Sequence, residues 1–229
     1  MLALTAADWT AIRLSLQVGL SATLLALPFG FAAAWLLVFS RMPGKALFDG
    51  LINLPLVLPP VVTGYLLLLL CGDRGALGPV LHWLDLRIIF TLKGAVLASV
   101  VVGFPLLVRS IRLGMEAIDD KLIQASRTLG AHWYDTLLSV ILPLSRRALL
   151  AGSTLMFARS LGEFGATIVL AGNIPGVTQT IPLAIYDYTN TPGGDRLALS
   201  LCLVSILISY GVLLFNESLA RKAREGERR

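Results

Sequence analysis

Long apolar stretches alternate with short polar ones along this chain, and five of the apolar stretches are as long as membrane spans. A helix needs about 20 residues to cross the roughly 30 Å hydrocarbon core of a bilayer. The pattern predicts an all-α integral membrane protein, with residues 1–229 forming a single transmembrane domain of about five helices. The expected spans are residues 14–39, 51–71, 92–108, 148–170 and 197–215.

The second stretch differs from the others because it contains Pro55, Pro59 and Pro60 in its first half. Proline has no backbone N–H, so two adjacent prolines interrupt the hydrogen bonds of a helix. Backbone groups freed inside a bilayer must be covered by protein. We therefore expect a kinked or partly unwound segment here that is packed against another part of the chain.

The composition agrees with a lipid environment and excludes several classes of function. Of the 229 residues, 56% are hydrophobic and 14% are charged, whereas soluble domains are about 25% charged. The net charge is +5, but no basic stripe with interleaved aromatics indicates nucleic-acid binding. His82 and His132 stand apart, and Cys71 and Cys202 lie in or beside apolar runs. We expect no metal site and no catalytic residues, so the chain is predicted not to be an enzyme.

The distribution of basic residues predicts the orientation, because the cytoplasmic segments of membrane proteins are rich in Lys and Arg. With the C-terminus inside, thirteen basic residues are cytoplasmic: Arg41, Lys45, Arg109, Arg112, Lys121, Arg127, Arg146, Arg147, Arg221, Lys222, Arg224, Arg228 and Arg229. Five are outside: Arg13, Arg74, Arg87, Lys93 and Arg196. The N-terminus is therefore expected outside and the C-terminus inside.

A long cytoplasmic loop, residues 116–143, follows the third expected span. Asp119–Asp120 suit the start of a helix, and Leu122, Ala125 and Leu129 recur at helical spacing before Gly130, a typical C-terminal stop. A second amphipathic segment, 132–141, is expected to end at Leu142–Pro143. The pattern fits either a rigid prominence on the cytoplasmic face or an amphipathic helix that lies on the membrane surface.

The same loop carries a recognisable motif, Gln124-Ala125-Ser126-x3-Gly130-x9-Val140-x-Leu142-Pro143. It resembles the EAA loop of bacterial ABC-importer permeases, whose consensus is EAA-x3-G-x9-I-x-LP. The resemblance implies a type I importer permease in which the loop is a coupling helix that docks on an ATPase subunit. It further implies close approach at Ala125, Ser126 and Gly130 and polar contacts from Arg127. Because position 124 is Gln instead of Glu, no salt bridge is expected from it.

Four further segments are similar to the membrane subunits of molybdate importers, within the sulfate and molybdate branch of this family: residues 54–65, 157–167, 173–182 and 191–194. The resemblance implies a multi-pass permease of the bacterial inner membrane that imports molybdate, with tungstate as a second substrate. Its implied partners are a second copy of the chain, two ABC ATPase subunits and a periplasmic molybdate-binding protein. A permease for sulfate, thiosulfate or another oxyanion is the alternative.

A P-loop of the form Gly-x4-Gly-Lys-Ser/Thr does not occur in the sequence, and such a loop is what cradles nucleotide phosphates. We therefore expect no cofactor in this chain. ATP and Mg²⁺ are expected to bind to the partner ATPase.

Arg159 and Glu163 are charged residues well inside an expected span. A central charge costs roughly 2.5–3.5 kcal/mol on insertion scales, so neither should face lipid alone. The two residues are four apart, which allows an ion pair that holds the bundle together. The other interpretation is a gate or an anion-lining group in the outer half of the membrane.

Small residues and prolines near this pair form a second set of candidates. Gly165, together with Pro59, Pro60, Thr63 and Gly64, fits either close helix packing and kinking or a lining of the transport pathway. The outer segment, residues 172–195, contains a predicted short helix at 181–188. It fits either a solvated loop or a docking surface for a binding protein.

Overall fold

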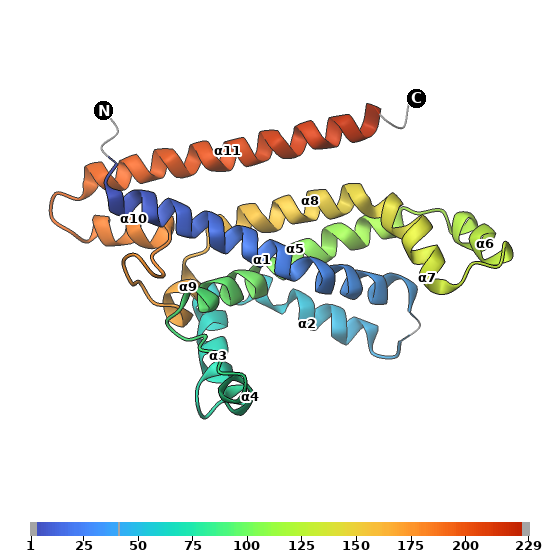
Figure 1. Ribbon diagram of the computed structural model, residues 1–229, viewed down its shortest axis with the longest axis horizontal. Coiled ribbons are helices and arrows are strands. Elements are labelled where there is room, and N and C mark those ends of the chain that lie inside the picture. The colour runs from blue at the N-terminus through green and yellow to red at the C-terminus, as the bar shows by residue number, and fades with distance from the viewer. Residues whose placement is uncertain (1–3, 41, 226–229) are drawn as a thin grey trace.

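The computed structural model describes residues 4–40 and 42–225, and all regular elements in these ranges are helical (Figure 1). Their order is α1 (Ala6–Phe39), α2 (Lys45–Val57), α3 (Pro60–Cys71), α4 (Gly78–Trp83), α5 (Leu92–Glu116), α6 (Asp120–Thr128), α7 (Trp133–Thr136), the π-helix η1 (Leu137–Ile141), α8 (Leu142–Leu161), α9 (Gly165–Leu170), α10 (Ile181–Thr189) and α11 (Asp195–Glu225).

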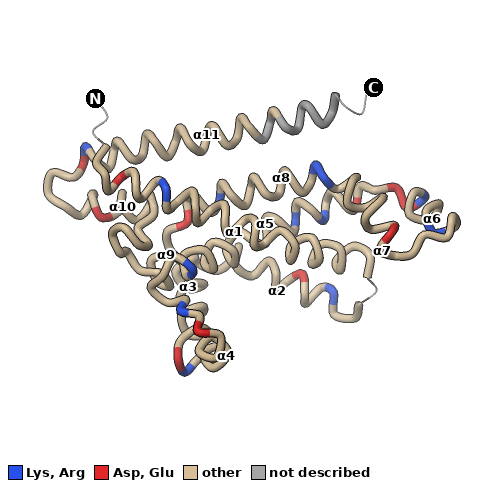
Figure 2. Tube along the Cα trace, in the orientation of Figure 1, with Lys and Arg blue, Asp and Glu red and all other residues tan. Residues whose placement is uncertain are grey.

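Four helical segments of the described chain are long and apolar enough to cross a bilayer: Ala6–Phe39, Leu92–Glu116, Trp133–Leu161 and Asp195–Phe215. A fifth span is present if α2 and α3, which are bent by 116° at their junction, count as one. The long helices run side by side along the molecule, and the middle stretches of α1 and α5 carry no charged residue (Figure 2). The all-helical membrane fold expected from the sequence is confirmed.

α1 begins eight residues before the expected span at residue 14, because its N-terminus is capped. Thr5 Oγ1 accepts a hydrogen bond from Asp8 N at 3.3 Å, and Asp8 Oδ2 accepts one from Thr5 N at 2.6 Å. This reciprocal pair satisfies backbone N–H groups that are otherwise without partners at a helix start. Arg13 consequently lies on an exposed face of the helix and not in a loop before it.

The break expected at the prolines is present and is sharper than a kink. α2 ends at Val57, Leu58 is extended with φ −71° and ψ 141°, and α3 starts at Pro60. A residue before proline is driven out of the helical region, and proline itself is well tolerated at a first helical position. The chain therefore changes direction here, and α3 with α4 projects sideways from the long helices (Figure 1).

α5 lies at the centre of the bundle, where small residues allow its neighbours to approach. Gly30 of α1 faces Leu107 of α5, and a Cβ on Gly30 would stand 2.7 Å from Leu107 Cδ2. Gly103 of α5 packs on Met156 of α8, where the corresponding distance to Met156 Cγ is 2.9 Å. Inside a bilayer, such close packing contributes most of the attraction between helices.

The expected end of a helix at Leu142–Pro143 is wrong. Helical structure runs without interruption from Trp133 to Leu161, through the π-turn at 137–141. Leu142 N donates to Leu137 O, five residues back, and Pro143 sits in the first turn of α8, where a missing N–H is tolerated. The fourth expected span instead breaks at Gly162–Phe164, and α9 continues after it.

The short helix expected at 181–188 is present as α10 and is attached to the start of α1. Tyr188 Oη donates to Asp8 Oδ1 at 2.8 Å, and Ile181 N donates to Ser15 Oγ at 2.7 Å. Asp8 is 1% exposed. The outer segment is thus anchored at two points and is not simply a solvated loop.

Candidate functional site

The residues of the coupling-loop motif lie at one end of the molecule, on and next to α6. This helix projects beyond the ends of α1, α5 and α8 (Figure 1). Gln124, Ala125 and Arg127 are exposed on α6, and Ser126 is half-buried. Leu142 and Pro143 are also exposed but belong to the first turn of α8. The motif therefore covers both the projecting helix and the start of the helix that returns into the bundle.

Two large apolar side chains on and next to α6 are exposed, and a third is buried. Leu122 is 49% exposed and Leu129, which follows the helix directly, is 88% exposed, whereas Ile123 is 8% exposed and faces the rest of the loop. Large apolar side chains at the tip of a projecting helix are a costly surface in water. The apolar positions that recur at helical spacing in the sequence, Leu122, Ala125 and Leu129, are thus exposed and could contact a partner protein.

The loop is held in shape by contacts on its inner side. Asp119 caps α6 by accepting from Lys121 N at 2.9 Å, and Ser126 Oγ lies 3.0 Å from Thr136 Oγ1 of α7. Gly130, between the helices, has φ +87°, a conformation that glycine adopts without strain. These contacts hold α6 against α7 in one prominence at the end of the molecule.

A second cluster of predicted residues meets where the breaks before α3 and α9 face each other. Pro60 and Gly64 of α3 lie against Gly165 and Ala166 of α9. A Cβ on Gly165 would be 2.9 Å from Pro60 Cβ, and one on Gly64 would be 2.7 Å from Ala166 Cα. The backbones of the two broken spans therefore touch directly. Thr63 is buried beside this contact, whereas Pro59 is exposed at its edge.

Arg159 and Glu163 form the ion pair that their spacing suggested, with 2.8 Å between Arg159 Nη2 and Glu163 Oε2. Glu163 is not on the helix, since α8 ends at Leu161. Its Oε1 accepts from Ala166 N at 2.9 Å, at the start of α9. The Glu163 side chain is 2% exposed and that of Arg159 is 31% exposed. One carboxylate thus joins the end of α8 to the start of α9, next to the contact with α3.

The two clusters are at different places in the molecule. The coupling-loop residues are at the end that carries α6 and α7, and the break residues are near α9, toward the end that carries α10 (Figure 1). α8 connects them, because it starts beside the loop and ends at Leu161, two residues before Glu163. α8 is therefore the direct structural connection between the two clusters.

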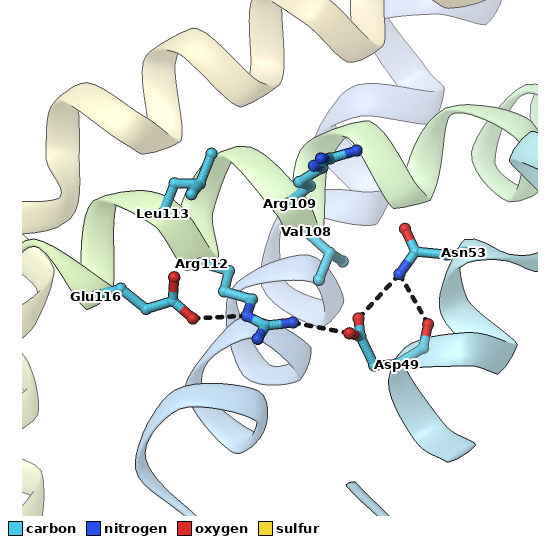
Figure 3. A pocket seen from close by; sticks show the side chains of 7 residues that line it. All are labelled: Asp49, Asn53, Val108, Arg109, Arg112, Leu113 and Glu116. Atoms are coloured by element: carbon cyan, nitrogen blue, oxygen red, sulfur yellow. Dashed lines mark hydrogen bonds and ion pairs between the residues drawn. The ribbon is translucent and has the colours of Figure 1, made fainter. Parts of the chain in front are cut away.

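Sequence reasoning missed a polar network between α2 and α5 at the coupling-loop end (Figure 3). Arg112 contacts Asp49 Oδ2 through Nη1 and Glu116 Oε1 through Nε, both at 2.8 Å. Asn53 Nδ2 donates to Asp49 Oδ1 at 2.9 Å. These residues line a cavity of about 340 Å³ together with Arg109. The sequence contained a sign of this network: Asp49 is the single acidic residue between Asp8 and Asp73, and an isolated acidic residue at the end of an apolar region needs a basic partner.

Comparison with known proteins places these features in a family. Residues 26–225 match the model of the binding-protein-dependent transport system inner membrane component. The chain is 52% identical over 223 residues to the molybdenum transport system permease protein ModB of Escherichia coli (strain K12), covering 97% of each chain. It is 41% identical over 177 residues to the sulfate transport system permease protein CysW of Synechococcus elongatus, covering 77% of this chain and 62% of that one.

The fold is also similar to a solved structure, that of a bacterial alginate ABC transporter in complex with an alginate pentasaccharide-bound periplasmic protein. The TM-score is 0.76 at 13% identity, covering 96% of this chain and 80% of the other. This likeness confirms the ABC-importer permease fold expected from the sequence. The chain is a multi-pass transport protein of the inner membrane, and it belongs to the family of binding-protein-dependent transport system inner membrane components.

Proposed function

We propose that this chain is the pore-forming permease subunit of an ATP-driven importer that moves molybdate into the cytoplasm. The observation that carries the proposal is the 52% identity to a molybdenum permease over 97% of both chains. A match over the whole length includes the helix breaks as well as the loop. Tungstate is the expected second substrate, because both ions are tetrahedral dianions.

The exposed face of α6 supports a role as the coupling helix, with Gln124, Ala125, Ser126 and Arg127 at the contact with an ATPase. Leu122 and Leu129 provide an apolar surface there that is open in the isolated chain. ATP and Mg²⁺ bind to the partner subunit, which supplies the energy for transport. Two copies of the permease with two ATPases and a periplasmic molybdate-binding protein form the complete importer.

The contact between α3 and α9 is proposed as the outer gate of the pathway, formed by Pro59, Pro60, Thr63, Gly64 and Gly165 with the Arg159–Glu163 pair. With the N-terminus outside and the C-terminus inside, this contact lies in the outer half of the five-span bundle. In this proposal the gate is closed when α3 lies on α9, as it does here, and open when the two helices separate. The ion pair keeps the two charges neutralised within the bilayer.

Uptake into vesicles tests the proposed substrate. The complete importer, with its cognate binding protein and internal ATP, should accumulate labelled molybdate. Excess tungstate should compete strongly, and excess sulfate only weakly. Strong competition by sulfate or thiosulfate would support the alternative, a sulfate-type permease, which the 41% identity to CysW favours as second candidate. Uptake that persists without ATP would contradict the importer class itself.

A further inference from the structure

An apolar groove of about 550 Å³ runs along the side of the bundle between α1, α8 and α11. Each helix contributes two turns with the same spacing: Leu20 to Leu27 on α1, Leu150 to Phe157 on α8 and Ile208 to Phe215 on α11. Seven residues of helix correspond to about 10 Å, roughly a third of the hydrocarbon core. The groove is therefore a slot parallel to the long helices.

The hydroxyl groups in the groove are already used by their own helices. Thr23 Oγ1 donates to Gly19 O at 2.8 Å, Ser153 Oγ to Leu149 O at 2.6 Å and Thr154 Oγ1 to Leu150 O at 2.9 Å. Such bonds to the preceding turn remove the polar hydrogen from the surface. The slot thus offers an apolar surface, and its occupant must be apolar where it lies between the helices.

Arg146 lies just beyond the cytoplasmic end of the groove. It precedes Leu150 by four residues on α8, so it shares the helical face that carries Leu150, Thr154 and Phe157. The rise from Leu150 to Arg146 is about 6 Å. Arg146 is exposed and forms no ion pair with any residue in the described part of the chain. A positive charge therefore stands over one end of an apolar slot.

We propose that the groove binds one acyl chain of an anionic phospholipid from the cytoplasmic leaflet, with the lipid phosphate at Arg146. The groove alone selects no particular lipid, because lipid tails are as apolar as the leucines that they would replace. Selection comes from the head group, since guanidinium forms strong paired hydrogen bonds with phosphate. The lipid fills the space between α11 and the α1–α8 pair and links the last helix to the bundle.

Gly211 makes the groove testable without disturbing the fold. A Cβ on Gly211 would meet nothing within 4 Å, so Gly211→Phe can start a side chain from this position and place a ring in the slot. Phe is also a better helix former than Gly. Gly50 of α2 is a matched control, because its Cβ position is equally open and lies outside the groove.

The experiment uses the complete importer in phosphatidylcholine nanodiscs with a trace of phosphatidylglycerol that carries a photoreactive group in its acyl chain. Labelled peptides are identified by mass spectrometry. Labelling should concentrate on peptides of α1, α8 and α11 and fall to background in Gly211→Phe, but not in Gly50→Phe. Arg146→Gln should reduce it about fivefold, the ratio expected for one basic side chain near an anionic surface, whereas Arg109→Gln at the same end should not.

Several outcomes would overturn the proposal. Equal labelling by a photoreactive phosphatidylcholine would remove the head-group preference, and full labelling of Gly211→Phe would place the lipid elsewhere. If protein–protein cross-links in place of lipid adducts form at these three helices, a second polypeptide covers the groove.

Discussion

Gly64 of α3 lies so close to Ala166 of α9 that a Cβ on residue 64 would stand 2.7 Å from Ala166 Cα and 2.8 Å from Ala166 O. Neither neighbouring atom is the flexible end of a side chain, so neither can move without shifting a helix. This one contact joins two broken spans that are about a hundred residues apart in the sequence. It explains why residue 64 is a glycine, because any larger side chain would collide with the backbone of α9.

Gly64→Ala is therefore expected to destabilise the protein by about 1–3 kcal/mol, the usual cost of overpacking a tight contact. Thermal unfolding of the purified variant in detergent measures this loss. Gly50→Ala, where the added methyl group meets nothing within 4 Å, should be neutral or slightly stabilising. Equal stability of the two variants would show that α3 and α9 are not in close contact.

The two members of the Arg159–Glu163 pair should respond differently to neutralisation. Glu163 is 2% exposed and Arg159 is 31% exposed. Arg159→Gln leaves a buried carboxylate without its partner, which costs about 3–5 kcal/mol. Glu163→Gln leaves an arginine that can still reach water or head groups. The amide oxygen of the new glutamine can still accept the hydrogen bond from Ala166 N.

A double-mutant cycle measures this asymmetry. Unfolding of the double variant Arg159→Gln/Glu163→Gln should require more free energy than unfolding of Arg159→Gln alone, because no unpaired charge remains. Additive losses in the cycle would mean that the pair is not formed in the membrane.

Asp49 and Arg112 tie α2 to α5 at the coupling-loop end. Their side chains are 36% and 32% exposed, so the pair should contribute no more than about 1 kcal/mol. Asp49→Asn should speed hydrogen exchange in the first turns of α2, and high salt should produce the same effect in the unmodified protein. Glu116→Gln is the control: it removes a partner of Arg112 within α5 and should leave α2 unchanged.

Tyr188 should make the attachment of α10 sensitive to alkaline pH. Burial and the hydrogen bond to Asp8 raise the pKa of the Tyr188 phenol above its ordinary value, which is about 10. The attachment is therefore complete below the ordinary pKa and is lost as pH rises through the raised one, when two negative oxygens would face each other. Proteolysis of the outer segment as a function of pH measures the transition, and Tyr188→Phe should abolish its pH dependence.

Gly130 is expected to control coupling through its backbone conformation. With φ +87° and nothing within 4 Å of a Cβ, a replacement is limited by strain and not by space. Asn tolerates this region far better than a β-branched residue. Gly130→Val should thus reduce ATP-driven uptake much more than Gly130→Asn at equal amounts of assembled complex. Similar activity of both variants would show that the turn does not position α6.

Much of the molecule could be predicted because its signals are local. The prolines at 59–60 forced a break whatever their surroundings, and Gly130 ended a helix because of its own conformational freedom. The prediction at Pro143 was wrong because it also used only a local signal. A proline is expected to end a helix, but here a π-turn precedes it and Pro143 lies in the first turn of α8. That outcome depends on how α8 continues into the bundle, which no local pattern reports.

The sequence by itself determined that this protein is a helical membrane protein. It also predicted that the N-terminus lies outside, that the C-terminus lies inside and that the loop at residues 116–143 couples transport to an ATPase. Hydrophobic length, charge and a motif within one loop need no knowledge of distant residues. Only the tertiary structure showed that Gly64 packs against Ala166, that Arg112 forms an ion pair with Asp49 and that Tyr188 donates a hydrogen bond to Asp8. Each of these contacts joins residues more than sixty positions apart, and packing of the whole bundle determines which of them come together.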